Sequence, residues 1–182
     1  MAENIEKNIW EILTQIEPET SRLQETPHRV AKSYMELFEG YAQSPEQIVG
    51  SALYKTPTQE MVVLRDIPFS SHCEHHMLPI IGYVHIGYMP DTSIIGASKL
   101  ARLVDCFAHR LQLQERLTVA LVEALTLILK PKGVAVGMAA EHYCITQRGT
   151  KKKGTQLVTQ HFSGVFCTDR VLRQEFLRTS RL

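Results

Sequence analysis

The densest group of reactive side chains is the run SHCEHH at residues 71–76, which stands between two apolar stretches. Within it, Cys73 and His76 are separated by two residues, a spacing that lets a thiolate and an imidazole reach one metal ion from a single turn of chain. His142 and Cys144 lie two residues apart, and we predict that one strand projects both from the same face. The sequence therefore contains two segments that could serve one ion.

Three of these side chains, Cys73, His76 and Cys144, are ligands of the kinds that zinc prefers, and they would leave its fourth tetrahedral position to water. An open position is typical of a catalytic zinc, because the metal lowers the pKa of that water toward neutrality. His75 and His142 are not needed as ligands and could move protons near pH 7. The predicted chemistry is metal-assisted hydrolysis.

Spacing alone leaves three alternatives open. His72 could replace His76 as a ligand, the zinc could be purely structural, or no metal could be bound, since a His or Cys is more often an ordinary surface or core residue. We expect such ordinary roles for the remaining histidines and cysteines, which are His28, His85, His109, His161, Cys106 and Cys167.

A candidate anion site lies at Gly96-Ala97-Ser98, before a predicted helix that carries Lys99 and Arg102 in its first turns. These two cations are three residues apart and are therefore neighbours on one face, beside free backbone N–H groups and a positive dipole end. That combination suits a phosphate chain. Arg148 could add to it, whereas the run Lys151 to Lys153 is more simply a solvated segment.

Gln114, Glu115 and Arg116 open the next predicted helix. The carboxylate of Glu115 could be a helix N-terminal charge with no special function. It could equally accept hydrogen bonds from the edge of a guanine ring, and periodicity does not decide between the two.

The elements that position these groups begin with two helices. Apolar residues at helical spacing from Ile5 to Ile16 predict a helix that ends before Pro18, and Thr26 followed by Pro27 predicts a second helix that stops near Gly40. We predict an N-terminal helical extension over residues 1–41 and one catalytic domain over residues 42–182. Segment 42–60 is polar and contains two prolines, which favours a connecting loop.

From Met61 the pattern predicts the order strand, strand, helix, helix, strand, strand. Residues 61–69 and 80–89 are rich in β-branched and aromatic residues, and 133–145 and 157–166 predict two further strands. Apolar residues at helical spacing predict helices over 98–109 and 115–130. This order is typical of an α+β fold in which an antiparallel sheet carries two consecutive helices on one side.

Charge and composition exclude several classes of partner. Lys and Arg number 20 against 19 for Asp and Glu, so a net charge of +1 gives no general attraction to nucleic acid or to an anionic membrane. The N-terminus MAENIEKNIWEIL lacks the uninterrupted apolar run of a signal peptide or membrane span. We expect a cytoplasmic protein without nucleic-acid or membrane partners, in which Cys near His binds metal rather than forming disulfides.

Four motifs resemble GTP cyclohydrolase I in order and spacing: CEHH at 73–76, GASKLARL at 96–103, LQLQERLT at 111–118 and EHYCITQRG at 141–149. Residues 26–41 also resemble the N-terminal helix of that family, so nearly the whole chain is covered. The resemblance implies a tunnelling-type α+β fold. It also implies a homodecamer of two stacked pentameric rings, with active sites where subunits meet.

The resemblance implies zinc as cofactor and GTP as substrate. The zinc ligands would be Cys73, His76 and Cys144, which removes His72 from the set. Proton transfer would fall to His75 and His142, with help from Ser98, and Glu115 would recognise the guanine ring. The implied substrate contacts are Ser98, Lys99, Arg102, Gln114, Glu115 and Arg148.

The implied reaction converts GTP and water into formate and 7,8-dihydroneopterin triphosphate, the first step of pterin and folate biosynthesis. Attack at C8 opens the imidazole ring of guanine, formate leaves, the ribose rearranges and a six-membered ring closes. Ala97 stands where the family usually has Leu, and stretch 154–164 is less rich in Thr and Ser than its usual counterpart. The competing interpretations are a paralogue that uses iron or stops at the formamide, and a silent homologue that binds GTP or pterin.

Overall fold

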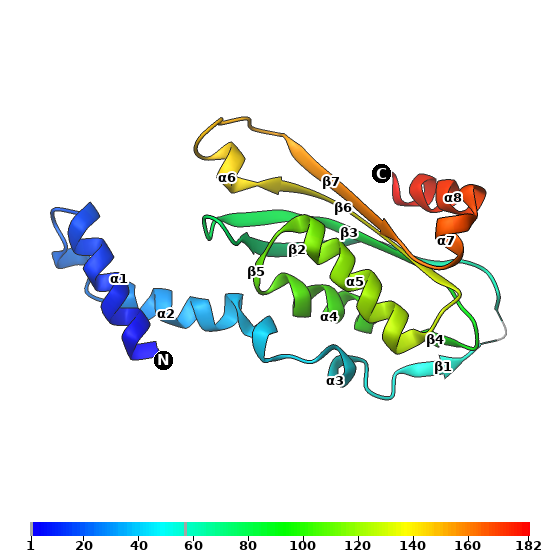
Figure 1. Cartoon of the computed structure of the whole chain (residues 1–182). Coiled ribbons are helices and arrows are strands. Elements are labelled where there is room, and N and C mark those ends of the chain that lie inside the picture. Colours follow the sequence, from blue (N-terminus) through cyan, green and yellow to red (C-terminus); the bar gives the residue numbers. More distant parts are fainter. Residues whose placement is uncertain (1, 57) are drawn as a thin grey trace. The chain divides into compact units, whose positions relative to one another are not determined.

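The computed structural model describes residues 2–56 and 58–182 (Figure 1). The chain divides into two compact units, one up to Glu39 and one from Gly40 to Leu182. The first unit packs helix α1 (Ala2–Ile16) against helix α2 (Thr26–Leu37), with a short 3₁₀ turn at Ser21–Leu23 between them. Both helices lie where the sequence predicts them. Pro27 stands in the first turn of α2, where its fixed φ suits a helix start.

The second unit is built on a five-stranded sheet with the order β5-β2-β3-β6-β7. The strands β2 (Val62–Cys73), β3 (Pro79–Met89), β6 (Gly133–His142) and β7 (Gln156–Phe162) pair antiparallel. The two-residue strand β5 (Leu111–Gln112) pairs with the end of β2 in parallel. The sheet is therefore mixed, and the prediction of a purely antiparallel sheet is wrong at this edge.

Helices α4 (Ala97–Ala108) and α5 (Gln114–Leu129) lie along the sheet (Figure 1). Helix α4 runs back along the sheet in the direction opposite to β3, so the short strand β5 after it has the same direction as β2. The main core lies between these helices and the sheet, because alternate residues of each strand face them. Its members from β6, α4 and α5 include Val134, Val136, Met138, Leu100, Leu103, Val104, Leu117, Leu121 and Leu125.

The chain ends in two helices that the sequence analysis missed, α7 (Val165–Thr168) and α8 (Arg170–Ser180). The strand predicted over 157–166 ends at Phe162, because Gly164 turns the chain with a φ of 55° and Asp169 then caps α8. A second, smaller core holds Phe166 and Phe176 with Ala135 of β6. Since Ala135 alternates with the β6 residues of the main core, α7 and α8 cover part of the opposite face of the sheet.

Segment 42–60 is not simply a loop. It contains the short helix α3 (Pro45–Val49), capped by Ser44, and strand β1 (Leu53–Lys55), which pairs with β4 (Ser93–Ile95). A three-residue strand depends on a partner about forty positions away, so its own composition does not reveal it. Within the described parts of the chain, no helix combines the length and the apolar character needed to cross a bilayer.

Candidate active site

A tight turn between β2 and β3 brings Cys73 and His76 together. The Cys73 amide donates to the carbonyl of Leu78 at 2.9 Å, and the Cys73 carbonyl accepts from the amides of His76 and Met77 at 3.3 and 2.7 Å. Met77 adopts a left-handed φ of 55° that closes the turn. As a result, Sγ of Cys73 lies 3.8 Å from Nδ1 of His76.

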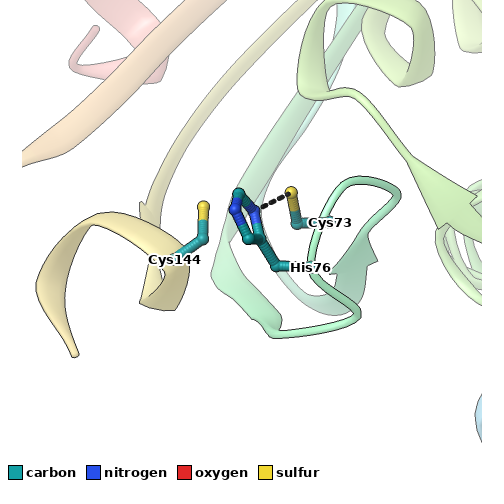
Figure 2. Close-up of side chains that lie close together, drawn as sticks. All are labelled: Cys73, His76 and Cys144. Atoms are coloured by element: carbon teal, nitrogen blue, oxygen red, sulfur yellow. Dashed lines mark hydrogen bonds between the residues drawn. The ribbon is translucent and has the colours of Figure 1, made fainter. Parts of the chain in front are cut away.

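Cys144 completes a group of three possible metal ligands. The ligand atoms of Cys73, His76 and Cys144, here called the Cys/His group, all lie within 4.8 Å of one another. Figure 2 shows the imidazole of His76 between the two thiols. The prediction that one strand carries both His142 and Cys144 is wrong, because β6 ends at His142 and Cys144 lies in the short helix α6 (Tyr143–Thr146).

The Cys/His group fits a zinc ion by the chemistry of its donors, since two thiols and one imidazole are ligands that zinc prefers. It is the one group of this kind among the described residues, and His72 is not a member. Burial raises the pKa of the Cys144 thiol, and the neighbouring Cys73 reinforces this effect. The raised pKa favours the protonated thiol. A metal ion between the two sulfurs would instead lower the pKa and favour the thiolate.

His142 lies at the end of β6, buried beside the first turn of α5. Its Nε2 is 2.8 Å from Oε1 of Gln114. Burial lowers the pKa of the His142 imidazole, and the charge of Glu115 partly opposes this shift. A histidine predicted to move protons therefore sits in a shielded position next to the Cys/His group.

Gln114 and Glu115 occupy the start of α5 but have different surroundings. Gln114 is buried, and its Nε2 lies 2.9 Å from the carbonyl of Leu157 and 3.1 Å from Oγ1 of Thr159. Glu115 is exposed at the next position. Contact with substrate stays a prediction for both residues, although only Glu115 presents its polar group to solvent.

An ion pair that the sequence analysis missed ties the turn at 73–76 to α5. The Arg116 guanidinium donates to both oxygens of Glu74, at 2.8 and 3.2 Å, and this pairing lowers the pKa of the Glu74 carboxyl. The Glu74 amide also donates to the carbonyl of Gln112 at 3.1 Å. His75 is exposed beside this pair, with its Nε2 3.8 Å from Oε1 of Glu74. The sequence offered one indication of this pair, because Glu74 and Arg116 have opposite charges and lie in the motifs at 73–76 and 111–118.

Arg148 lies directly beside the Cys/His group. Its Nη1 is 2.7 Å from Nε2 of His76, and the rest of the side chain is exposed. The lysines at 151–153 are exposed, as expected for a solvated run. One of the predicted phosphate contacts is thus placed close to the metal ligands.

The remaining predicted contacts lie elsewhere in the chain. Ser98, Lys99 and Arg102 are in the first turns of α4, which follows β4 and therefore lies near the end of β3 at Met89. The Cys/His group lies at the other end of the same strand, and the 11 residues of β3 span roughly 36 Å. A single chain thus keeps the two groups of predicted site residues at opposite ends of the sheet (Figure 1).

The family model described as GTP cyclohydrolase I matches residues 5–181. The chain belongs to the GTP cyclohydrolase I family. A GTP cyclohydrolase 1 of Bartonella bacilliformis is 44% identical over 182 residues, which cover 98% of this chain and 88% of that protein. A GTP cyclohydrolase 1 of Brucella anthropi is 49% identical over 149 residues, which cover 81% and 70%.

Membership of the GTP cyclohydrolase I family makes the chain an enzyme, as the resemblance of its motifs implies. The matched residues include the Cys/His group, His142 and both ends of α4. Among solved structures, an archaeosine synthase QueF-Like in the apo form aligns over 60% of this chain and 97% of that chain, with 20% identity and a TM-score of 0.48.

Proposed function

We propose that the chain converts GTP and water into formate and 7,8-dihydroneopterin triphosphate, with zinc as its cofactor. The observation that carries this proposal is the Cys/His group, whose ligand atoms lie within 4.8 Å of one another, next to the buried pair of His142 and Gln114. Two thiols and an imidazole beside a second histidine suit metal-assisted hydrolysis.

In this proposal Cys73, His76 and Cys144 hold the metal. Zinc, when bound, would supply the Lewis acidity that activates water near neutral pH for attack on the purine. Arg148, which contacts His76, supplies a fixed positive charge beside the reacting centre. That charge suits a substrate that carries a triphosphate.

His75 and His142 are the proposed proton carriers. They reach the site from different elements, His75 from the exposed turn before β3 and His142 from the buried end of β6. Imidazoles in two such different surroundings suit two different proton transfers during ring opening and release of formate. Ser98 is proposed to assist the rearrangement of the ribose that follows.

The guanine ring is proposed to bind at the start of α5. Glu115 is exposed there, and its carboxylate can accept two hydrogen bonds from the donors on one edge of guanine. The helix start alone would already favour a negative charge at this position. The proposed recognition therefore depends on Glu115 facing the substrate rather than only the helix.

The triphosphate is proposed to bind Ser98, Lys99 and Arg102 of a second copy of the chain. These residues lie at the far end of the sheet from the Cys/His group, so one chain does not offer both to one GTP molecule. This separation supports the proposal of a homo-oligomer with sites between subunits. We extend it to the tunnelling-type decamer of two pentameric rings and to a cytoplasmic location, with no nucleic-acid or membrane partner.

The test is incubation of the purified, zinc-loaded protein with GTP, with formate and the fluorescence of the oxidised pterin followed in parallel. Equal amounts of both products are expected. Formate without pterin would indicate a ring-opening paralogue, and the absence of both would contradict the proposal. Metal analysis of the protein as isolated distinguishes zinc from iron.

A further inference from the structure

The side chain of Gln114 bridges three elements inside the second unit. It is only 1% exposed. Its Nε2 faces the carbonyl of Leu157 at 2.9 Å and Oγ1 of Thr159 at 3.1 Å, both on β7. Its Oε1 faces Nε2 of His142, at the end of β6, at 2.8 Å. Both ends of a buried amide are therefore occupied by protein partners.

The partners of this amide fix which way round it lies. A backbone carbonyl such as that of Leu157 can only accept a hydrogen bond, so the end of Gln114 that faces it must be the NH₂ group. The reversed amide would set two acceptors against each other at 2.9 Å in a buried place, which is costly. The end that faces His142 is consequently the oxygen.

The threonines around the amide strengthen this orientation. Oγ1 of Thr118 lies 2.7 Å from the backbone carbonyl of Gln114 and 2.7 Å from Oγ1 of Thr159. Thr118 is itself buried, at 1% exposure. Thr159 of β7, which contacts the side-chain amide of Gln114, is thus itself held by Thr118 of α5, and a satisfied buried network of this kind is rigid.

The orientation of Gln114 in turn determines the tautomer of His142. An amide oxygen can only accept, so Nε2 of His142 must carry a hydrogen. In a neutral imidazole the other nitrogen, Nδ1, then holds the lone pair. Among the described residues, Nδ1 of His142 has no hydrogen-bond partner, so it is the nitrogen open to a substrate.

We infer that Gln114 is a positioning residue, which orients the ring of His142 through Nε2 and leaves Nδ1 as the nitrogen that exchanges a proton with the substrate. A proton taken up at Nδ1 leaves the Nε2–H bond to Gln114 in place, and the same nitrogen returns it. This inference rests on the proposed role of His142 in the reaction. It assigns Gln114 a task other than direct contact with GTP.

The kinetic test replaces Gln114 by an apolar residue of similar length. For Gln114→Met we expect kcat to fall by about 10- to 100-fold, as for other residues that orient a working histidine, with zinc content unchanged and the KM for GTP within about twofold. Gln114→Glu keeps an oxygen opposite Nε2 but sets a second acceptor against the Leu157 carbonyl, so it should recover only part of the lost kcat. A rise in KM alone, or a kcat within about twofold of the original, would overturn the inference.

The matched control is Gln112→Met. Gln112 is also a buried glutamine, and its Nε2 donates to the carbonyl of Phe107 at 2.8 Å, but its side chain does not contact His142. The same substitution there should leave kcat within about twofold. An equal loss of kcat in both variants would mean that Gln114 acts only through general packing and would overturn the positioning role.

A second measurement does not depend on how the variants fold. Neutron diffraction from crystals of the zinc-loaded protein at pH values where His142 is neutral should locate a hydrogen on Nε2 and none on Nδ1. A hydrogen on Nδ1 alone would overturn the inference. If the protein released neither formate nor pterin but kept the Nε2 hydrogen, the proposed function would fail while the assigned tautomer stood.

Discussion

The two proposed proton carriers differ in what surrounds their rings. His142 is 8% exposed and donates to Gln114, whereas His75 is exposed beside the carboxylate of Glu74. Neither belongs to the Cys/His group, although each lies within two residues of one of its members. Loss of either ring should therefore disturb the chemistry without removing the metal.

Substitution of these residues separates the two tasks. We expect His75→Ala and His142→Ala to lower pterin formation by at least about 100-fold while zinc stays bound, because a lost general acid or base typically costs this much. Cys144→Ala should lose both zinc and activity, since it removes one of three ligands. Activity assays and metal analysis on the same samples distinguish loss of proton transfer from loss of zinc. Histidine variants that lack zinc would contradict the assigned roles.

Arg148 is an exposed cation that contacts one of the metal ligands, with its Nη1 2.7 Å from Nε2 of His76. If it contacts the triphosphate, Arg148→Ala should raise the KM for GTP about tenfold, the loss of one charge-assisted contact, and leave zinc content unchanged. Lys152→Ala removes an exposed charge of the same sign nearby and serves as the control. Equal KM values for both variants would count against a phosphate contact at Arg148.

At the scale of elements, the Glu74 and Arg116 pair joins the turn that carries the ligands to the start of α5. The Arg116 side chain is 56% exposed, so the pair contributes little to global stability. We expect the pair to hold the turn at 73–76 in place, together with the hydrogen bond from the Glu74 amide to the Gln112 carbonyl. This predicts a local effect on the metal rather than a general loss of fold.

We expect Arg116→Met to weaken zinc binding by about tenfold with little change in melting temperature, because residues that orient ligands typically affect metal affinity to this extent. Zinc affinity is measured by competition with a chelator. In a double-mutant cycle, Glu74→Gln should add no further loss to Arg116→Met, since each change breaks the same pair. Additive losses would show that the two side chains act separately.

The bulge in β2 between Leu64 and Ile67 depends on a neutral histidine from β3. Nδ1 of His85 accepts a hydrogen bond from the Asp66 amide at 3.1 Å, and Asp66 has a φ of 58°. Burial lowers the pKa of His85, while the charge of Asp66 opposes this and that of Arg65 adds to it. Protonation of His85 would remove the acceptor that supports the bulge.

This lowered pKa has a definite sign in the unfolding equilibrium. The unfolded chain binds the His85 proton more tightly than the folded chain, so the free energy of unfolding should fall as pH drops below the ordinary pKa of about 6.5. The fall should level off once the folded form is also protonated. Urea unfolding from pH 7.5 to 5 should give a shallower dependence for His85→Gln, and an unchanged slope would contradict this account.

At the scale of the whole molecule, sequence reasoning was strongest where ligands lie close together in the chain and where apolar periodicity is long. The spacing of Cys73 and His76 predicts that one turn of chain brings them together, and the apolar periodicity of α4 and α5 predicts both helices. The ion pair of Glu74 with Arg116 joins residues 42 positions apart, and the bond of His142 to Gln114 joins residues 28 apart. Such contacts arise only after the sheet and α5 have packed, so local patterns do not contain them.

The short strands and the last helix were not predicted from the sequence for a related reason. Strands β1 and β5 have three and two residues, and they exist because a partner strand completes their hydrogen bonds. Helix α8 has a polar sequence with few apolar anchors, of which Phe176 is the most buried. Its signal was the cap at Asp169, which stands close to the predicted end of a strand.

The proposed sharing of sites between subunits predicts complementation. Lys99→Ala with Arg102→Ala damages the start of α4, and Cys144→Ala damages the Cys/His group at the other end of the sheet. Mixed and reassembled, the two inactive proteins should regain roughly a quarter of normal activity, because random assembly pairs an intact α4 with an intact Cys/His group at that frequency. A mixture of Cys73→Ala and Cys144→Ala damages the same group and should stay inactive. No recovery in the first mixture would place the whole site within one chain.

The closeness of two thiols to a single imidazole also concerns how the protein must be handled. Without a bound cation, Cys73 and Cys144 would face each other with their sulfurs within 4.8 Å and with a histidine able to accept a proton between them. Two thiols this close can be joined in a disulfide by dissolved oxygen, although slowly, because burial raises the pKa of the Cys144 thiol and disfavours its thiolate. Chelated samples stored without reductant should therefore fail to recover when zinc is returned, whereas samples kept anaerobic should recover fully.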